Sequence, residues 1–189
     1  MRRLLAGVSY AVLALDDFPG VVLPPEGETS YADNALGKAR AVAAGTGLLA
    51  LGDDSGLEVD ALGGGPGVVS ARYGGPGLDD RGRCTRMLEA LRGVPPARRA
   101  AHFRSVIALA DPLGNELVVE GVADGVLLGA PRGSGGFGYD PIFFYPPLGA
   151  AFAELGDAVK DEVSHRGLAM LQAREALRRW PRAADSAPR

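Results

Sequence analysis

Two long segments of β-type sequence, separated by a tight turn, place the strongest constraint on how this chain can fold. Residues 100–110 and 116–128 are rich in Val, Ile, Leu and Ala, and the residues between them (Asp111-Pro112-Leu113-Gly114-Asn115) are typical of a turn. These segments predict two long strands of one β-sheet. Helical patterns mix with further strand patterns without strict alternation, over 30–44, 79–92 and 164–180. We therefore expect an α/β (α+β) fold with an elongated, mixed β-sheet flanked by helices.

Length and composition narrow the class of protein. With 189 residues, 47% of them apolar, the chain can form one globular domain, which we expect over 1–180, followed by a disordered tail over 181–189. No apolar run approaches the roughly 18 residues of a membrane span, and the N-terminus is too short a stretch for a secretory signal, so we expect a cytoplasmic protein. The net charge of −3 argues against nucleic-acid binding. One cysteine, Cys84, excludes an internal disulfide and a cysteine-rich metal site.

Paired carboxylates form the first candidate site. Asp53 and Asp54 follow an apolar run and precede Ser55-Gly56, so we expect an Asp-Asp-Ser-Gly turn between short strands over 48–52 and 57–61. Glu26 lies in a loop that follows a strand expected over 8–15, and with Asp54 it could hold Mg²⁺, which favours oxygen ligands. The alternative interpretation is an ordinary polar turn beside solvated loop acids.

A glycine-rich loop forms the second candidate site. The four glycines of 133–138 would let the backbone approach a ligand closely, and the aromatic side chains Phe137 and Tyr139 could stack on a nucleobase. A hairpin-like connection explains the same glycines almost as well.

Cations at the start of the last helix form the third candidate site. Ser164 is expected to cap this helix, and Lys160, His165 and Arg166 lie within seven residues of one another. Cations oppose the positive end of a helix dipole, so this arrangement suggests a ligand that compensates them. Exposed side chains are an equally good explanation of His165 and Arg166. Lysine is rare in this arginine-rich chain, which makes the other lysine, Lys38, a further candidate.

Five segments that include these sites resemble, in the same order, the inosine/xanthosine triphosphate pyrophosphatases, which hydrolyse deaminated purine nucleoside triphosphates. The segments are 30–39, 52–73, 103–112, 131–143 and 164–168. The resemblance implies two lobes with the active site in the cleft between them, a homodimer, and a purine nucleoside triphosphate as substrate.

The resemblance also implies roles for particular residues. By position, Asp54 would bind Mg²⁺ and act as general base toward water, and Glu26, or else Glu28, would supply the second metal carboxylate. Water would then release nucleoside monophosphate and pyrophosphate. The residues implied to bind substrate are Ser55, Phe137, Gly138, Tyr139, Asp140, Lys160, His165 and Arg166. Because Lys and Arg only donate hydrogen bonds, they favour a 6-oxo over a 6-amino purine.

One departure from the family lies at the N-terminus. Family members begin with a strand and a Thr/Ser-Gly-Asn-x-x-Lys loop that grips the triphosphate, whereas residues 1–5 resemble the end of the helix that follows it. The first hypothesis is an active enzyme whose start codon was assigned too far downstream. The alternatives are a truncated nucleotide-binding protein with little turnover, and a pyrophosphatase that acts on modified pyrimidine nucleotides.

Overall fold

A six-stranded antiparallel sheet organises the computed structural model, which describes residues 2–181. The strand order is β2-β1-β3-β4-β5-β6. The bounds are Ala50–Val59 for β1, Pro66–Gly67 for β2, Ala100–Ala110 for β3, Glu116–Leu127 for β4, Phe143–Tyr145 for β5 and Ala150–Ala151 for β6. The long hairpin β3–β4 is therefore confirmed, with Ala110 opposite Glu116 at its turn.

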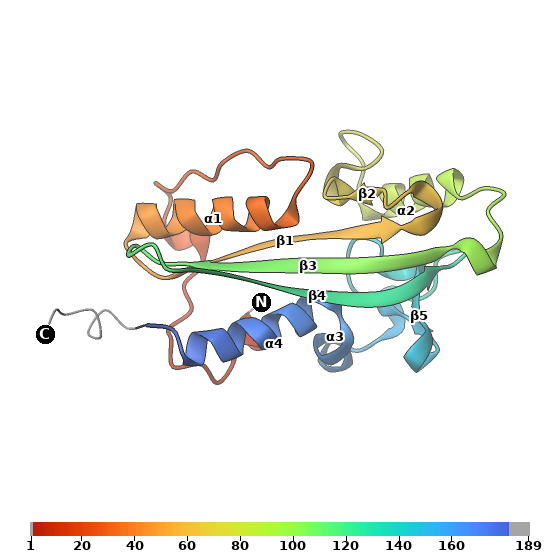
Figure 1. Cartoon of the computed structure of the whole chain (residues 1–189). Coiled ribbons are helices and arrows are strands. Elements are labelled where there is room, and N and C mark those ends of the chain that lie inside the picture. Colours follow the sequence, from red (N-terminus) through yellow and green to blue (C-terminus); the bar gives the residue numbers. More distant parts are fainter. Residues whose placement is uncertain (1, 182–189) are drawn as a thin grey trace, which may run out of the picture.

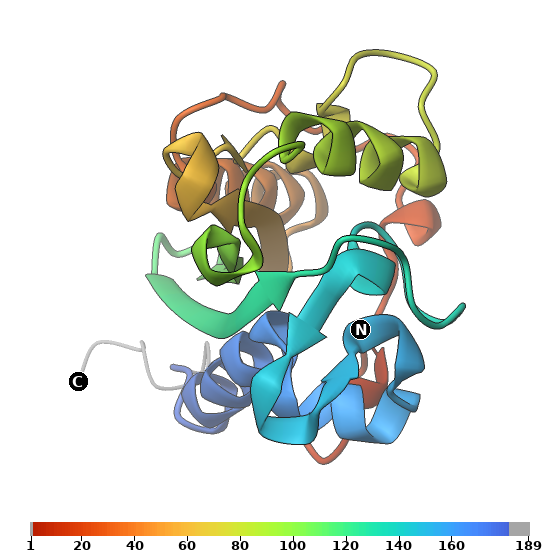
Figure 2. The ribbon, with the colours of Figure 1, turned by 90° about the vertical axis from the view of Figure 1, so that its right-hand side faces the viewer.

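Helices cover both faces of the long strands (Figure 1). Helix α1 (Tyr31–Thr46) packs on β1 and β3, and α4 (His165–Arg178) packs on β3 and β4 on the opposite face. Helix α2 (Asp80–Ala90) and the short strands gather at one end of the sheet and form a second lobe (Figure 1). Viewed from that end, α2 lies on the side of α1, whereas β5 lies on the side of α4 and of α3 (Asp157–Val163) (Figure 2).

Alternation along β3 divides the core between the two helices. Val106 and Ala108 face α1, where they join a cluster with Ala35 and Ala39, whereas Ile107 and Leu109 join the cluster beneath α4. Successive side chains of a strand point to opposite faces, so one apolar run of β3 contributes to the core under α1 and to the core under α4. A third, aromatic cluster at the end of the sheet includes Phe103, Phe143 and Phe152.

The α/β class, the elongated sheet and the three principal helices are confirmed, but the sheet is antiparallel at every described pairing and not mixed. The chain leaves β1 at Val59 and enters β3 at Ala100, and the register puts Val59 opposite Ala101. The connection that contains α2 therefore brings the chain into β3 at the same end of the sheet at which β1 stops, and the two strands run antiparallel. A parallel pair needs a crossover that returns to the opposite end.

Two sequence-based expectations about strands are wrong. The segment 8–15 is not a strand; after a 3-10 turn at Arg2–Leu5 it bends, and Val8 and Val12 pack against the α4 cluster instead of pairing with a neighbour. The Asp-Asp-Ser-Gly segment is not a turn, because β1 continues through it and pairs with β3 along its whole length.

The remaining expectations concern the membrane and the C-terminus. Within residues 2–181, no helix combines the length and apolarity that a membrane span requires. Of the expected tail, only residue 181 is described, and 182–189 lie outside the described residues.

Candidate active site

The two adjacent acids of β1 point to opposite faces of the sheet. Asp54 pairs across the sheet with Val106, on the face covered by α1, and Asp53 pairs with Ile107, on the face covered by α4. This separation follows from the strand conformation of 53–55. The candidate site therefore has two halves, an α1-face half around Asp54 and an α4-face half around Asp53.

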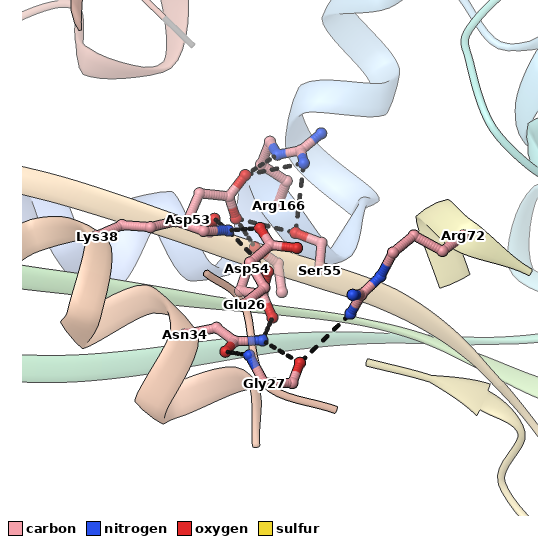
Figure 3. Close-up of polar contacts among 10 residues, drawn as sticks. Glu26, Gly27, Asn34, Lys38, Asp53, Asp54, Ser55, Arg72 and Arg166 are labelled. Carbon is pink, nitrogen blue, oxygen red and sulfur yellow. Dashed lines mark hydrogen bonds and ion pairs between the residues drawn. The ribbon is translucent and has the colours of Figure 1, made fainter. Parts of the chain in front are cut away.

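The α1-face half brings two carboxylates to one ammonium group (Figure 3). Lys38 Nζ lies 2.6 Å from Glu26 Oε1 and 2.9 Å from Asp54 Oδ1, and it also donates to the Asp53 carbonyl at 3.0 Å. Burial is the largest influence on Lys38 and lowers its pKa, but the bonds to Glu26 and Asp54 together outweigh it, so the pKa is raised. Glu26 and Asp54 thus converge as the sequence predicted, and Glu26 is the loop acid that the structure brings to Asp54.

Asn34 ties the loop that carries Glu26 to the strand that carries Asp54 (Figure 3). Its Oδ1 accepts from the Gly27 amide at 2.8 Å, and its Nδ2 donates to the Gly27 carbonyl at 3.1 Å and to Asp54 Oδ2 at 3.1 Å. Arg72 approaches the same loop, 3.4 Å from the Gly27 carbonyl. Sequence reasoning missed Asn34 and Arg72 in the site, and it noticed Lys38 only through the rarity of lysine.

The local sequence explains why α1 places these side chains over β1. Ser30 caps the helix by accepting from the Asp33 amide at 3.1 Å. A Cβ atom at Gly52 would lie 2.2 Å from the Ala35 carbonyl oxygen, so only glycine lets the helix approach this closely. Asn34 and Lys38 therefore reach Asp54 because β1 has no side chain at position 52.

In the α4-face half, Asp53 is surrounded by donors. Its Oδ1 accepts from the hydroxyls of Ser55 and Ser105, both at 2.9 Å, and its Oδ2 accepts from Arg166 Nε at 2.8 Å. Arg166 Nη2 also lies 3.3 Å from the Ser55 hydroxyl oxygen. Asp53 therefore holds a cation of this chain, on the opposite face of β1 from Asp54 and Glu26.

The glycine-rich loop meets the cations of the α4-face half. Phe137 is 55% exposed, and its ring centroid lies 4.6 Å from Lys160 Nζ and 5.2 Å from Arg166 Cζ. The structure thus brings Phe137, Lys160 and Arg166 together, as the sequence predicted for a base-binding surface. Gly138, in contrast, contributes its backbone to packing: its amide donates to Asp80 at 2.6 Å and its carbonyl accepts from the Cys84 thiol at 3.3 Å.

Two neighbours of Phe137 are buried instead of lining this surface. Asp140 is 1% exposed, and its carboxylate accepts from the Phe137 amide at 2.8 Å and pairs with Lys160. Burial raises the pKa of Asp140, against the opposing effect of Lys160. Tyr139 is 4% exposed and donates its hydroxyl to the Ser70 carbonyl at 2.8 Å. These side chains support the loop, because neither presents a free polar group or an open ring to a ligand.

His165 is buried at the first turn of α4. Its ring stacks on Phe103 with centroids 4.6 Å apart, and its Nδ1 has no hydrogen-bond partner among the described residues. Burial, followed by the nearby charges of Arg166 and Lys160, lowers the pKa of His165 to about 3. The imidazole is therefore neutral near pH 7, and the two cations are compensated by Asp53 and Asp140. A ligand is not needed to explain cations at this helix start.

Comparison with known proteins agrees with this architecture. A sequence model of the Ham1 family matches residues 1–176. The chain belongs to the Ham1 family. This membership confirms the resemblance seen in the five sequence segments.

Individual Ham1 relatives match over nearly their whole length. The dITP/XTP pyrophosphatase of Desulforamulus reducens is 48% identical over 179 residues, which cover 95% of this chain and 89% of the relative. A Ham1 protein structure from Coxiella burnetii has a TM-score of 0.82 at 40% identity and covers 93% of this chain and 90% of its own. A dITP/XTP pyrophosphatase structure from Mycobacterium abscessus has a TM-score of 0.75 at 45% identity, with coverages of 91% and 90%.

Proposed function

We propose that this chain hydrolyses deaminated purine nucleoside triphosphates (dITP, ITP and XTP) to nucleoside monophosphate and pyrophosphate, with Mg²⁺ as cofactor, and so cleanses the nucleotide pool. Ham1 relatives named dITP/XTP pyrophosphatase support the reaction class. The observation that carries the proposal is the pair of half-sites: an acid cluster at Asp54 and an aromatic–cation surface at Phe137. They are linked through Asp53, which is adjacent to Asp54 in β1 and pairs with Arg166 beside Phe137.

The α1-face half fits a divalent cation. Glu26 and Asp54 each lie within 3 Å of the Lys38 ammonium, so their oxygens already converge on one positive charge. Residues 2–181 contain no cluster of three or more His, Cys, Asp or Glu side chains suited to a metal. Two carboxylates with substrate phosphates and water are the usual Mg²⁺ ligands. When bound, Mg²⁺ would neutralise phosphate charge and acidify water.

In this proposal Asp54 acts as the general base toward the attacking water. Its Oδ2 is held by Asn34 and its Oδ1 by Lys38, so the carboxylate is fixed before substrate arrives. Pre-oriented catalytic groups lower the barrier because they have no rotational freedom left to lose at the reaction step. The Lys38 ammonium donates to Glu26, Asp53 and Asp54, and it therefore serves to hold the two acids together.

The α4-face half selects the base. Phe137 offers an exposed ring for stacking, and Lys160 and Arg166 offer donors beside it. Both cations only donate hydrogen bonds, so they match the 6-oxo group of hypoxanthine or xanthine, whereas a 6-amino group would leave them unpaired. Because the half-sites lie on opposite faces of β1, the substrate would cross the outer edge of this strand, where β2 pairs only with Leu57 and Glu58.

The test is pyrophosphate release from equal concentrations of dITP, ITP, XTP, dGTP, dATP and dUTP, with and without Mg²⁺. We expect Mg²⁺-dependent hydrolysis of the first three and not of dATP, whose 6-amino group leaves the donors unpaired. Guanine also carries a 6-oxo group, so the rate for dGTP measures whether contacts beyond Lys160 and Arg166 contribute to selectivity. Loss of hydrolysis in Asp54→Asn excludes a contaminating enzyme. Preference for dUTP would favour a pyrimidine pyrophosphatase, and tight binding of dITP without turnover would favour a nucleotide-binding protein. Either result would refute the proposal.

Two further proposals accompany this function: that the chain forms a homodimer, and that it acts in the cytoplasm on the free nucleotide pool. Sedimentation at micromolar concentration tests the first, with a monomer as the contrary result. Fractionation of the source cells tests the second.

A further inference from the structure

Ser105 is a buried hydroxyl at the start of the apolar stretch that ends β3. It is 0% exposed, and the next residues of β3, including Val106, Ile107 and Leu109, are buried apolar side chains. A buried hydroxyl is unfavourable unless it makes a hydrogen bond. An alanine would fill this position without that cost, so the hydroxyl requires an explanation other than packing.

The hydrogen bond of Ser105 goes to Asp53. The register places Ser105 directly opposite Ser55, and both hydroxyls donate to Asp53 Oδ1 at 2.9 Å. Two donors from two strands fix this oxygen and therefore the plane of the carboxylate. The other oxygen, Oδ2, is left for Arg166, whose Nε and Nη2 both lie 2.8 Å away.

Arg166 needs such a support because its side chain is long and only partly enclosed. The side chain is 24% exposed, and a free arginine loses about 2 kcal/mol of rotamer entropy when it is held in one conformation. Its guanidinium lies over the Phe137 ring, 5.2 Å from the ring centroid. A rotation of the Asp53 carboxylate would move this guanidinium relative to the ring.

We propose that Ser105 is a positioning residue: its hydroxyl orients Asp53, and Asp53 orients Arg166 for recognition of the 6-oxo purine. The inference rests on the proposed function for the meaning of Arg166, but the chain of contacts from β3 to α4 is independent of it. Ser105 does not touch substrate, because it is fully buried beneath Asp53 and acts only through that carboxylate.

The kinetic experiment is a double-mutant cycle with Ser105→Ala and Arg166→Ala. We expect Ser105→Ala to raise the KM for dITP about fivefold, the effect of one lost hydrogen bond, with kcat unchanged within about twofold. In the Arg166→Ala background the same substitution should have no further effect, since non-additivity reports that two residues act together. Additive effects, or an unchanged KM, would overturn the inference.

A matched control separates positioning from packing. Ser70 is also a buried serine, 4% exposed, and its hydroxyl bonds to the backbone of Leu57 and Gly67, away from Asp53. Ser70→Ala should lower the thermal unfolding temperature at unchanged KM. Ser105→Cys, which keeps the size and a weak donor, should raise KM less than Ser105→Ala. A KM rise in Ser70→Ala as large as in Ser105→Ala would contradict a positioning role.

A spectroscopic measurement decides the inference without any substrate. The Nε–H resonance of Arg166, assigned by its disappearance in Arg166→Lys, should be sharp in the parent chain and broadened in Ser105→Ala, because the guanidinium then samples several orientations. An identical resonance in the two proteins would refute the inference. If the parent chain fails to hydrolyse dITP, the proposed function fails while this result still stands.

Discussion

The two faces of β1 each carry an aspartate, but the two aspartates have different charge partners. On the α1 face, Asp54 and Glu26 share one ammonium, that of Lys38, so two negative charges meet one positive charge. On the α4 face, Asp53 and Asp140 each hold a cation, Arg166 and Lys160 respectively. The first arrangement leaves a surplus of oxygen ligands. The second leaves two held cations beside an exposed ring.

This difference is one of charge balance. Asp53 and Asp140 are each paired with a cation of their own, whereas Asp54 and Glu26 share one cation and keep a net negative charge that a metal ion or a proton can neutralise. Strand alternation keeps the two functions apart, although Asp53 and Asp54 are adjacent in the chain. The following predictions test this contrast, from the largest expected effect to the smallest.

Exchanging each acid for its amide should separate the two faces kinetically. Asp54→Asn removes the proposed general base, and we expect kcat for dITP to fall about 10³-fold. Asp53→Asn loosens Arg166 and should raise KM about tenfold with kcat changed less than about threefold, because it alters binding more than the reaction step. Steady-state kinetics of both variants measure the split. Equal losses of kcat would show that the two faces do not differ in this way.

Removing Lys160 should destabilise the fold, because it leaves a buried acid without its cation. Lys160→Met leaves Asp140, whose side chain is 2% exposed, without its cation, and we expect the free energy of unfolding to fall by about 4 kcal/mol near pH 7. Burial already raises the pKa of Asp140. A group whose pKa is higher in the folded than in the unfolded state adds stability as the pH falls, so the deficit should shrink toward pH 5.

Urea unfolding at several pH values measures this deficit. The double variant Lys160→Met/Asp140→Asn is the control, and it should recover much of the loss. A deficit that is independent of pH would point to lost packing of the lysine stem instead.

Adding a methyl group at Gly52 should disturb the α1 face alone. The new Cβ would meet the Ala35 carbonyl oxygen at 2.2 Å, which forces α1 away from β1, and we expect a loss of about 2 kcal/mol in stability. Because Asn34 and Lys38 lie on this helix, activity should fall while the Arg166 resonance is unchanged. Gly20→Ala is the matched control, since a Cβ there meets nothing within 4 Å. A shift of the Arg166 resonance would show that the faces are not independent.

The two histidines should give pH dependences of opposite sign. His165 has a pKa of about 3 in the folded protein, below the unfolded value of about 6.5, so it lowers stability as the pH falls below about 6.5. Relative to His165→Gln, the parent should lose about 1 to 2 kcal/mol between pH 7 and pH 5.

His102 provides the contrast. Its bond to Asp124, helped by Asp60, raises its pKa, so its contribution is present at acid pH and is lost as the pH rises through the folded pKa. His102→Gln should therefore reduce stability mainly at low pH. If the free energy of unfolding changed with pH by the same amount in the two variants, the burial of His165 would be contradicted.

Most of the fold could be predicted from the sequence because its signals are local. Ser30, Asp79 and Ser164 cap three helices, and each accepts a hydrogen bond from the backbone amide three residues on. The turn between β3 and β4 is equally local. The expected turn at 53–56 failed because Asp, Ser and Gly favour turns individually, whereas long-range pairing with β3 imposes strand geometry on them.

The site could be predicted only as far as its residue types. The convergence of Glu26 with Asp54, and of Phe137 with Lys160 and Arg166, agrees with the sequence-based expectation. The division of the two acids between faces depends on the conformation of β1, and the burial of Asp140 depends on packing from distant segments. Neither property has a local sequence signal.

The thiol of Cys84 gives this molecule a built-in chemical reporter. It is 3% exposed behind the glycine-rich loop, and it donates a hydrogen bond to the Gly138 carbonyl. Burial raises the pKa of the thiol to about 11, so it should resist alkylation while the loop packs against α2. Because the chain has one cysteine, the alkylation rate measures a single event, the parting of α2 from the loop that presents Phe137. A nucleotide that stabilises this loop in its packed position should therefore slow the alkylation of Cys84, although it does not contact Cys84.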